Sequence, residues 1–160
     1  MKRIVKKLIG LIVIISILIS FSKMANYRPI AESLIAVGAN LSCQKDKIYL
    51  DIEIQNNKDN FILVKGEGNS VRECINFIEK DNGKNLVLKN IRIIYIDESI
   101  QNEILEEIIK YNLIDLNVTV TNKKMQIVDN AKESITEKEY LKIKKSDHAV
   151  TLQEIVANLL

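Results

Sequence analysis

Chemically reactive side chains are scarce in this chain, and their spacing does not favour catalysis. His148 is the only histidine among 160 residues and lies in a polar stretch near the C-terminus. A serine–histidine pair or a histidine-based metal site therefore has no second member. We interpret His148 as a surface residue without a role in a site. We predict that the protein is not an enzyme, binds no cofactor and has no catalytic or metal-binding residues.

The two cysteines occupy positions that do not favour a disulfide. Cys43 falls in an expected hairpin turn, whereas Cys74 lies on the apolar stripe of an expected helix. A bridge needs Cα atoms about 4.4 to 6.8 Å apart, and the pattern does not bring the two residues together. Pairing remains an alternative in an exported domain. We expect Cys74 to be a small buried hydrophobic residue.

Two further patterns match ligand sites only in part. Gly66 and Gly68 precede a helix, but the third glycine and the lysine of a phosphate-binding loop are missing. A strand-to-helix turn that needs a permissive backbone explains them better. Asp51 and Glu53 share one face of a strand, where two carboxylates alone make a poor calcium site. We expect both acids to lie on a solvated face.

Alternation of apolar and polar residues predicts the strands that carry these groups. Residues 48–55 alternate at period two and form the clearest strand in the chain, with one dry face and one wet face. Residues 33–41 form an earlier β-like run, and the polar residues 42–46 are few enough to join the two as an antiparallel hairpin. A third run covers residues 61–64 and ends at the two glycines.

Capping and periodicity predict the helices. Ser70 and Glu73 fit a capping box, so a helix should begin there and stop at residues 81–84. Its apolar stripe must face the sheet, and consists of Val71, Cys74, Ile75 and Ile78.

The second half of the domain continues with alternating elements. The apolar segment 90–97 predicts a central strand that is covered on both faces. Helices are expected over residues 99–112 and 124–133, with a strand over residues 115–121 between them. The second of these helices should turn its apolar residues inward: Met125, Val128 and Ala131.

This order of elements predicts an α+β fold. Residues 31–133 give β-β-β-α-β-α-β-α, which indicates a mixed sheet with helices packed against it. Residues 134–160 are expected as a polar, solvated stretch over 134–147, for which a helix is an alternative, followed by a short C-terminal helix. A capping box of Thr151 and Glu154 marks the start of that helix.

The first 25 residues carry the pattern of a segment that enters a membrane. Four basic residues within the first seven positions precede an uncharged run of 14 residues, Leu8 to Phe21. As a helix this run is about 21 Å long, shorter than the hydrocarbon core of about 30 Å. A basic start and a short apolar run are typical of an export signal. We interpret residues 1–25 as an uncleaved anchor. The alternatives are a signal cut after Ser22 and a buried core helix.

Charge excludes a protein that depends on binding nucleic acid. The chain has 23 basic and 21 acidic residues, and the four basic residues at its start leave 19 against 21 for the remainder. Binding to phosphates needs a strongly basic face. If residues 1–25 engage a membrane, the basic start stays in the cytoplasm and the domain lies on the extracytoplasmic side.

Several segments resemble a known family. They are Val37-Gly38, DKIYLDIEIQN at residues 46–56, the block GEGNSVRECINFIEKDNGKNLVLKNIRIIYIDESI at residues 66–100, and VTVTN at residues 118–122. Together they resemble the N-terminal domain of the C subunit of spore germinant receptors, the Ger(x)C family, over roughly residues 34–131. The family's lipobox cysteine does not follow the apolar run, so lipid attachment is not implied.

The resemblance implies a function in assembly. The protein would be a membrane-anchored, extracytoplasmic binding component of a spore germination receptor at the spore inner membrane. Its partners would be the membrane-embedded receptor subunits. The alternatives are an exported accessory protein of another cell-envelope complex and a small secreted hydrolase.

Overall fold

The computed structural model describes residues 33–57, 60–146 and 149–159. The segment interpreted as an anchor, residues 1–25, and His148 lie outside the described residues. Within the described part of the chain, no helix combines the length and the apolar character that crossing a membrane requires.

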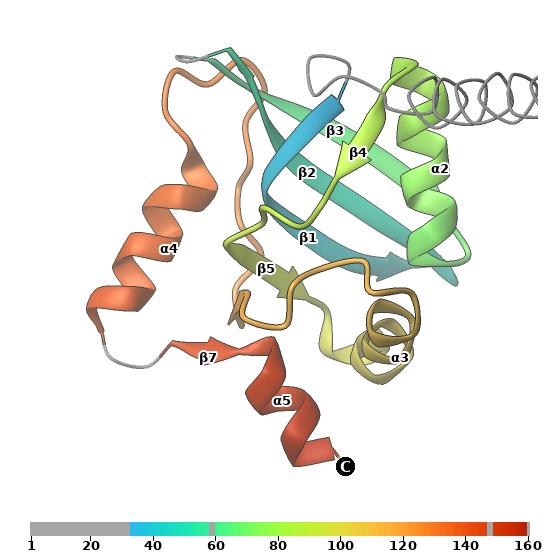
Figure 1. The fold of residues 1–160 in the computed structure, drawn as a ribbon, viewed down its shortest axis with the longest axis vertical. Helices are drawn as coiled ribbons and strands as arrows, with labels where there is room; N and C mark the ends of the chain where they lie inside the picture. The colour runs from blue at the N-terminus through green and yellow to red at the C-terminus, as the bar shows by residue number, and fades with distance from the viewer. Residues whose placement is uncertain (1–32, 58–59, 147–148, 160) are drawn as a thin grey trace, which may run out of the picture. The chain divides into compact units, whose positions relative to one another are not determined.

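The described strands form one mixed sheet, as the sequence predicts (Figure 1). The strands are β1 (Ser33–Gln44), β2 (Lys47–Asn57), β3 (Asn60–Gly68), β4 (Asn85–Val87), β5 (Ile93–Ile96), β6 (Thr119–Thr121) and β7 (Val150–Thr151). Their order is β3-β2-β1-β5-β6-β7, and β4 pairs with β1. β1, β2 and β3 are antiparallel neighbours, β5 runs parallel to β1 and β6, and β7 is antiparallel to β6.

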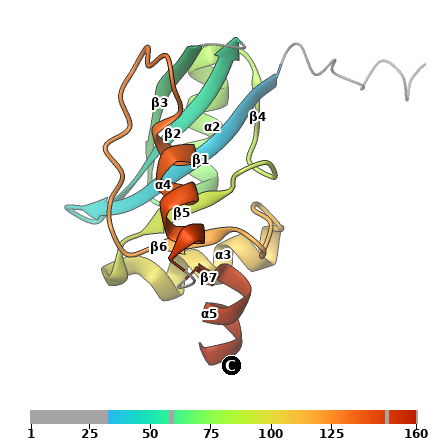
Figure 2. The same cartoon turned by 90° about the vertical axis from the view of Figure 1, so that its left-hand side faces the viewer.

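Helices cover both faces of this sheet. They are α2 (Val71–Asn82), the 3-10 turn η2 (Glu98–Ile100), α3 (Gln101–Tyr111), α4 (Ile135–Lys145) and α5 (Leu152–Leu159). Figure 2 shows α2 behind the sheet and α4 in front of it. The α+β class and the mixed sheet are therefore confirmed. The predicted order of elements is not matched throughout, because β4 and β7 were not predicted and the helix predicted over residues 124–133 does not form.

Cross-strand register sorts the residues of β1 and β2 onto two faces. Ile48, Leu50 and Ile52 lie on the same face as Ala39 and Leu41, and all five are buried in the core with α2 and α3. A register shift between Ala36 and Gly38 places Gly38 opposite Glu53 on the other face. The apolar half of the predicted alternation is thus confirmed as the core face.

The hairpin turn is tighter than predicted. Residues 42–44 belong to β1, and only Lys45 and Asp46 form the turn. Both have positive φ, 51° and 62°, which matches the twist of a two-residue hairpin. The predicted five-residue turn is therefore wrong, although the antiparallel hairpin itself is confirmed.

The helix that begins after Ser70 is confirmed at both ends. The Ser70 hydroxyl accepts a hydrogen bond from the Glu73 backbone N–H at 3.1 Å, and Gly83 ends the helix with φ 64°. Val71, Cys74 and Ile78 are fully buried, whereas Ile75 is only partly buried against the core. The predicted stripe faces the sheet, with Ile75 at its margin.

The predicted helix over residues 124–133 is wrong. This segment is irregular and crosses the second face of the sheet instead. The Asn40 side chain donates to the Met125 carbonyl at 2.9 Å and accepts from the Met125 N–H at 3.0 Å, and Ala131 forms a bridge with Phe61 of β3. These partners use the backbone groups that a helix would need. Met125 is buried, but Val128 is 54% exposed.

The strand predicted over residues 115–121 is shorter in the structure. The Asp115 carboxylate accepts from the Asn117 N–H at 2.9 Å, and its carbonyl accepts from the Val118 N–H. Residues 115–118 form this local turn and not a strand, so β6 begins at Thr119. β5 lies between β1 and β6, which confirms that the apolar segment 90–97 contains an interior strand.

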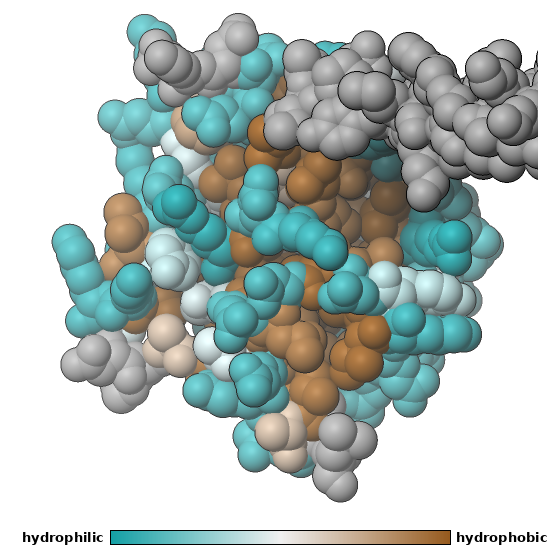
Figure 3. Space-filling model, in the orientation of Figure 1, coloured by the Kyte–Doolittle hydropathy of each residue, from teal (hydrophilic) through white to brown (hydrophobic). Residues whose placement is uncertain are grey.

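The C-terminal helix begins as predicted and packs on the domain. The Glu154 N–H donates to the Thr151 hydroxyl, and the Thr151 N–H donates to the Glu154 carboxylate. Leu152 is fully buried. Apolar residues gather between α3 and α5 on the face shown in Figure 3. Leu113, Leu116 and Ile155 are partly buried and pack against the core.

Candidate functional site

A buried carboxylate on β2 fixes the position of α4. Glu53 has no exposed surface, although the sequence predicted a solvated face at this position. Its Oε2 accepts hydrogen bonds from the hydroxyls of Ser134 and Thr136, each at 2.5 Å, and from the Thr136 N–H at 3.1 Å. Its Oε1 accepts from the Ile135 N–H at 2.8 Å. The expectation of a wet Glu53 is therefore wrong.

The surroundings of Glu53 explain how an acid is accommodated there. Its partners are the first backbone N–H groups of α4, which have no partner within the helix and carry the positive end of the helix dipole. Ser134 is also the N-cap of α4, and its hydroxyl accepts from the Glu137 N–H at 2.9 Å. Charge-assisted hydrogen bonds of this kind are stronger than neutral ones. Glu53 thus caps a helix from a neighbouring strand.

Gly38 allows α4 to come close enough for this contact. A Cβ at Gly38 would lie 2.4 Å from the Cβ of Thr136. Two carbon atoms that are not bonded to each other cannot approach so closely. Gly38 is the cross-strand partner of Glu53. The register shift in β1 therefore places a glycine and an acid side by side under the start of α4.

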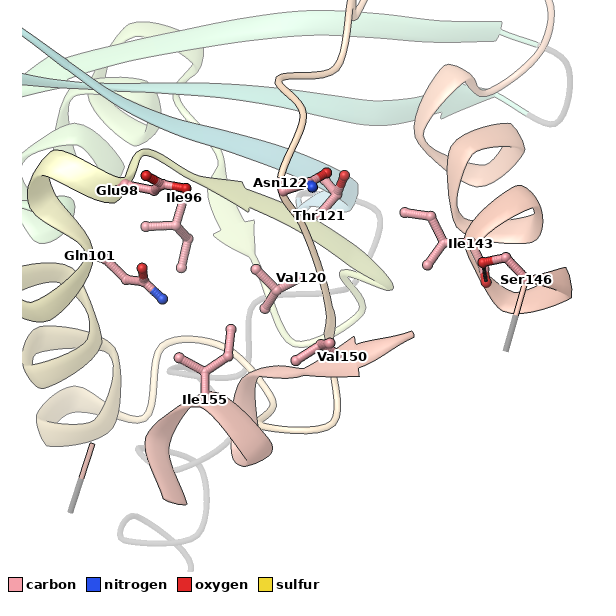
Figure 4. A pocket seen from close by; sticks show the side chains of 10 residues that line it. All are labelled: Ile96, Glu98, Gln101, Val120, Thr121, Asn122, Ile143, Ser146, Val150 and Ile155. Atoms are coloured by element: carbon pink, nitrogen blue, oxygen red, sulfur yellow. Dashed lines mark hydrogen bonds between the residues drawn. The ribbon is translucent and has the colours of Figure 1, made fainter. Parts of the chain in front are cut away.

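A pocket lies at the carboxyl ends of β5 and β6, with α4 and α5 as its walls (Figure 4). Its volume is about 450 Å³, which is within the range of small-ligand sites. In open sheets, ligands bind beyond the carboxyl ends of parallel strands. The pocket is lined by Ile96, Glu98, Gln101, Val120, Thr121, Asn122, Ile143, Ser146, Val150 and Ile155.

The lining combines apolar side chains with side chains that carry hydrogen-bonding groups. Val120 lies near the centre of the view in Figure 4, with Ile96 and Gln101 on one side of it and Val150 and Ile143 on the other. Among the described residues, no group makes a hydrogen bond or ion pair with the side chains of Glu98, Gln101 and Asn122. These groups are free to bind a ligand or a segment of another protein.

Two adjacent acids follow β5, of which Glu98 lines the pocket and Asp97 precedes it. The Ser99 hydroxyl donates to Asp97 at 2.8 Å and the Ser99 N–H donates at 3.1 Å, and these hydrogen bonds lower the pKa of Asp97. Asp97 is therefore ionised at neutral pH. Burial raises the pKa of Tyr95, and the charges of Asp97 and Glu98 raise it further. The pocket lining at Glu98 therefore favours cationic or hydrogen-donating groups of a ligand over anions.

The cysteines are both free thiols. Cys74 is buried and its Sγ donates to the Ile48 carbonyl at 3.3 Å. Burial, with a further contribution from the charge of Glu107, raises the pKa of Cys74 to about 12. Such a thiol stays protonated and unreactive. The prediction of a small buried residue at Cys74 is confirmed, and the alternative of a disulfide is wrong.

The remaining predicted positions do not form a ligand site. Asp51 is half-buried beside Lys65 of β3, apart from the buried partners of Glu53. A Cβ at Gly66 would lie 2.5 Å from the Cys74 carbonyl, so this glycine allows α2 to pack closely on β3. It has ordinary φ, so close packing rather than a special turn explains it. No group of three potential metal ligands occurs in the part of the chain that the structure describes.

The role of α4 in holding Glu53 was not predicted from the sequence. Residues 134–137 read Ser-Ile-Thr-Glu, which is itself a capping-box pattern. This signal marks the start of α4, which falls within the stretch 134–147 that was expected to be solvated, with a helix as the alternative. The carboxylate that caps it from 81 positions away has no such local signal.

Comparison with protein-family models, with curated proteins and with solved structures finds no match to this chain.

Proposed function

We propose that this protein is a non-catalytic binding component of a membrane-attached assembly, with its folded domain on the extracytoplasmic side. The assembly that we propose is a spore germination receptor, in which the chain binds the membrane-embedded subunits. The observation that carries the binding function is the pocket between α4 and α5, whose lining combines apolar side chains with free polar groups.

The chemistry of the pocket supports recognition over catalysis. Catalysis of acyl or phosphoryl transfer needs a nucleophile beside a base, or a bound metal. The pocket offers instead one carboxylate, two amides and two hydroxyls around apolar side chains. Mixed surfaces of this type bind apolar side chains and hydrogen-bond donors of a partner.

The proposed location of the protein at a membrane is supported by the sequence alone. A basic start followed by an apolar run of 14 residues is typical of a segment that engages a membrane. The choice of a spore germination receptor rests on the resemblance of residues 34–131 to the Ger(x)C family. An exported accessory protein of another cell-envelope complex remains the alternative assembly.

The proposal is tested by co-purification. The full chain with an affinity tag is produced together with the two membrane-embedded subunits of a germinant receptor, and the membranes are dissolved in mild detergent. We expect both subunits to co-purify. Asn122→Arg places a bulky cation in the lining of the pocket and should reduce the yield of co-purified subunits at least fivefold.

The matched control is Asn90→Arg. Asn90 is exposed and does not line the pocket between α4 and α5, so this variant should retain the subunits at the wild-type yield. Failure of the wild-type chain to retain either subunit would contradict the receptor assembly. An equal loss in both variants would contradict the role of the pocket.

A further inference from the structure

One edge of the sheet has free backbone groups. β3 ends the strand order on this side. Phe61 exchanges backbone hydrogen bonds with Ala131, and the Leu63 N–H donates to the Asp129 carboxylate at 3.1 Å. The backbone N–H and C=O groups of β3 that point away from β2 thus belong to every second residue, Phe61 and Leu63 first. The next two residues in this series are Lys65 and Glu67. Among the described residues, no group bonds to their outward N–H and C=O groups.

The charges on this free stretch are self-complementary. Lys65 and Glu67 are both exposed and flank Gly66 symmetrically. When a second β3 runs antiparallel with Gly66 opposite Gly66, each Lys65 faces the Glu67 of the other copy. Charges on an edge ordinarily discourage strand pairing, but this register converts them into two ion pairs, and opposite charges directly across a ladder are favourable.

The carboxylate of Glu67 has room for a second cation. It already pairs with Lys47 at 3.2 Å, and 45% of its side chain is exposed. A carboxylate accepts several hydrogen bonds through its two oxygens. Lys65 of a second copy therefore adds to the existing pair without replacing it.

An exposed aromatic residue lies on the flank of α2 that faces this edge. The opposite flank is in contact with the interior of the fold, since Glu79 accepts from the Leu86 N–H and the Arg72 guanidinium lies over the Tyr111 ring of α3, 5.0 Å from its centroid. Phe77 points about 140° to 160° away from these two residues around the helix. It follows Glu73 by one turn, and Glu73 lies against Gly68 of β3. Phe77 is 48% exposed.

We propose that two copies of this chain pair through their β3 edges, antiparallel and around a two-fold axis at Gly66. Lys65 and Glu67 of the two copies exchange four backbone hydrogen bonds and form two ion pairs. The two α2 helices then lie on the same face of the joined sheet, with Phe77 of each copy above the axis. This self-association goes beyond the proposed function and does not depend on which receptor the chain joins.

The first test removes one backbone donor without disturbing the fold. The full chain is studied by sedimentation in density-matched detergent. Lys65→Pro deletes an N–H that points away from β2, a position where an edge strand tolerates proline. We expect a wild-type dimer in the micromolar range and at least a tenfold weaker one in the variant, with unchanged circular dichroism. A wild-type monomer, or a dimer that persists in Lys65→Pro, would overturn the proposal.

The second test uses the symmetry of the charges. Lys65→Glu gives an edge with two acids, and Glu67→Lys gives an edge with two bases. Each variant alone should be monomeric, whereas an equal mixture should form a heterodimer, because both pairs across the axis are then of opposite sign. Lys89→Glu, an exposed change outside β3, should dimerise like the wild type. A mixture that associates no better than its components would refute this register.

Discussion

Glu53 shows how strongly the environment of one residue depends on distant parts of the chain. It stands in an alternating strand, at a position where the pattern predicts solvent. The structure gives it four donors from residues 134–136 and no exposed surface. A buried acid is tolerated only when its oxygens are satisfied in this way. Glu53 and the start of α4 therefore stabilise each other.

Glu53→Gln should destabilise the protein by about 3 kcal/mol, because an amide presents a donor to groups that are themselves donors. The measurement is urea unfolding followed by circular dichroism. Asp51→Asn is the matched control on the same strand, and it should change stability by less than about 0.5 kcal/mol because Asp51 is partly solvated. Equal midpoints for the two variants would show that Glu53 does not anchor α4.

The two thiols should differ in reactivity. At pH 8, iodoacetamide should alkylate Cys43, which is partly exposed, and leave Cys74 unmodified until the protein unfolds. The reason is that alkylation requires a thiolate and access, and Cys74 has neither. Mass spectrometry of the protein with and without urea checks this. Equal rates of modification in the folded protein would contradict the buried position.

The raised pKa of Cys74 also predicts a loss of stability at alkaline pH. The thiol remains protonated in the folded protein up to about pH 12, whereas its unperturbed pKa is 9.0. The contribution of the Cys74 thiol to the free energy of unfolding is therefore fully present below pH 9 and is lost as the pH rises toward 12. The unfolding midpoint of the wild type should fall more steeply over this range than that of Cys74→Ala. The same dependence of the unfolding midpoint on pH in both proteins would argue against a raised pKa of Cys74.

At the scale of elements, two helices begin against carboxylates from other elements. Glu107 of α3 accepts from the N–H groups of Val71 and Arg72 at the start of α2, at 2.8 and 2.9 Å. Glu53 does the same for α4. These acids replace the missing acceptors of the first turn and fix the angle at which each helix meets its neighbour. Glu107, which the helical pattern places mostly on the wet side, thus joins α3 to α2.

The packing of α2 predicts a graded response to truncation. Ile78→Ala should cost about 2–4 kcal/mol, because a fully buried side chain leaves a cavity under the helix. Ile75→Ala should cost about half as much, since Ile75 lies at the margin of the core. Chemical unfolding of both variants provides the comparison. A larger loss for Ile75→Ala would mean that the helix is rotated relative to the structure.

At the scale of the whole molecule, the described residues share one buried apolar core. The buried cluster runs from Leu34 to Leu152 and includes residues of β1, β2, α2, β5 and α3. Its residues complete a packed interior between the helices and the sheet. The domain therefore has the apolar contacts that cooperative folding requires.

Deletion of residues 1–25 should leave a soluble protein that unfolds in one cooperative transition. The physical reason is that the described residues from Leu34 onward form a buried apolar cluster among themselves. Thermal unfolding measured by circular dichroism and calorimetry tests this expectation. Aggregation of the shortened chain, or a gradual melt without a transition, would place the domain boundary elsewhere.

The sequence by itself determined the elements whose signals are local. The Ser70 cap, the stripe of α2, the alternation in β2 and the Thr151 capping box all depend on residues within a few positions of one another. Such interactions form in the same way in most folds. These elements and the mixed α+β class could therefore be predicted.

Only the tertiary structure decided the rest. Met125 bonds to Asn40 across 85 positions, and Ser134 bonds to Glu53 across 81. These contacts overrode a helical pattern at residues 124–133 and buried an acid on a face that alternation assigns to water. The pocket likewise forms where β5, β6, α4 and α5 converge. Burial and hydrogen bonding depend on which distant groups meet, and no local pattern along the chain encodes that meeting.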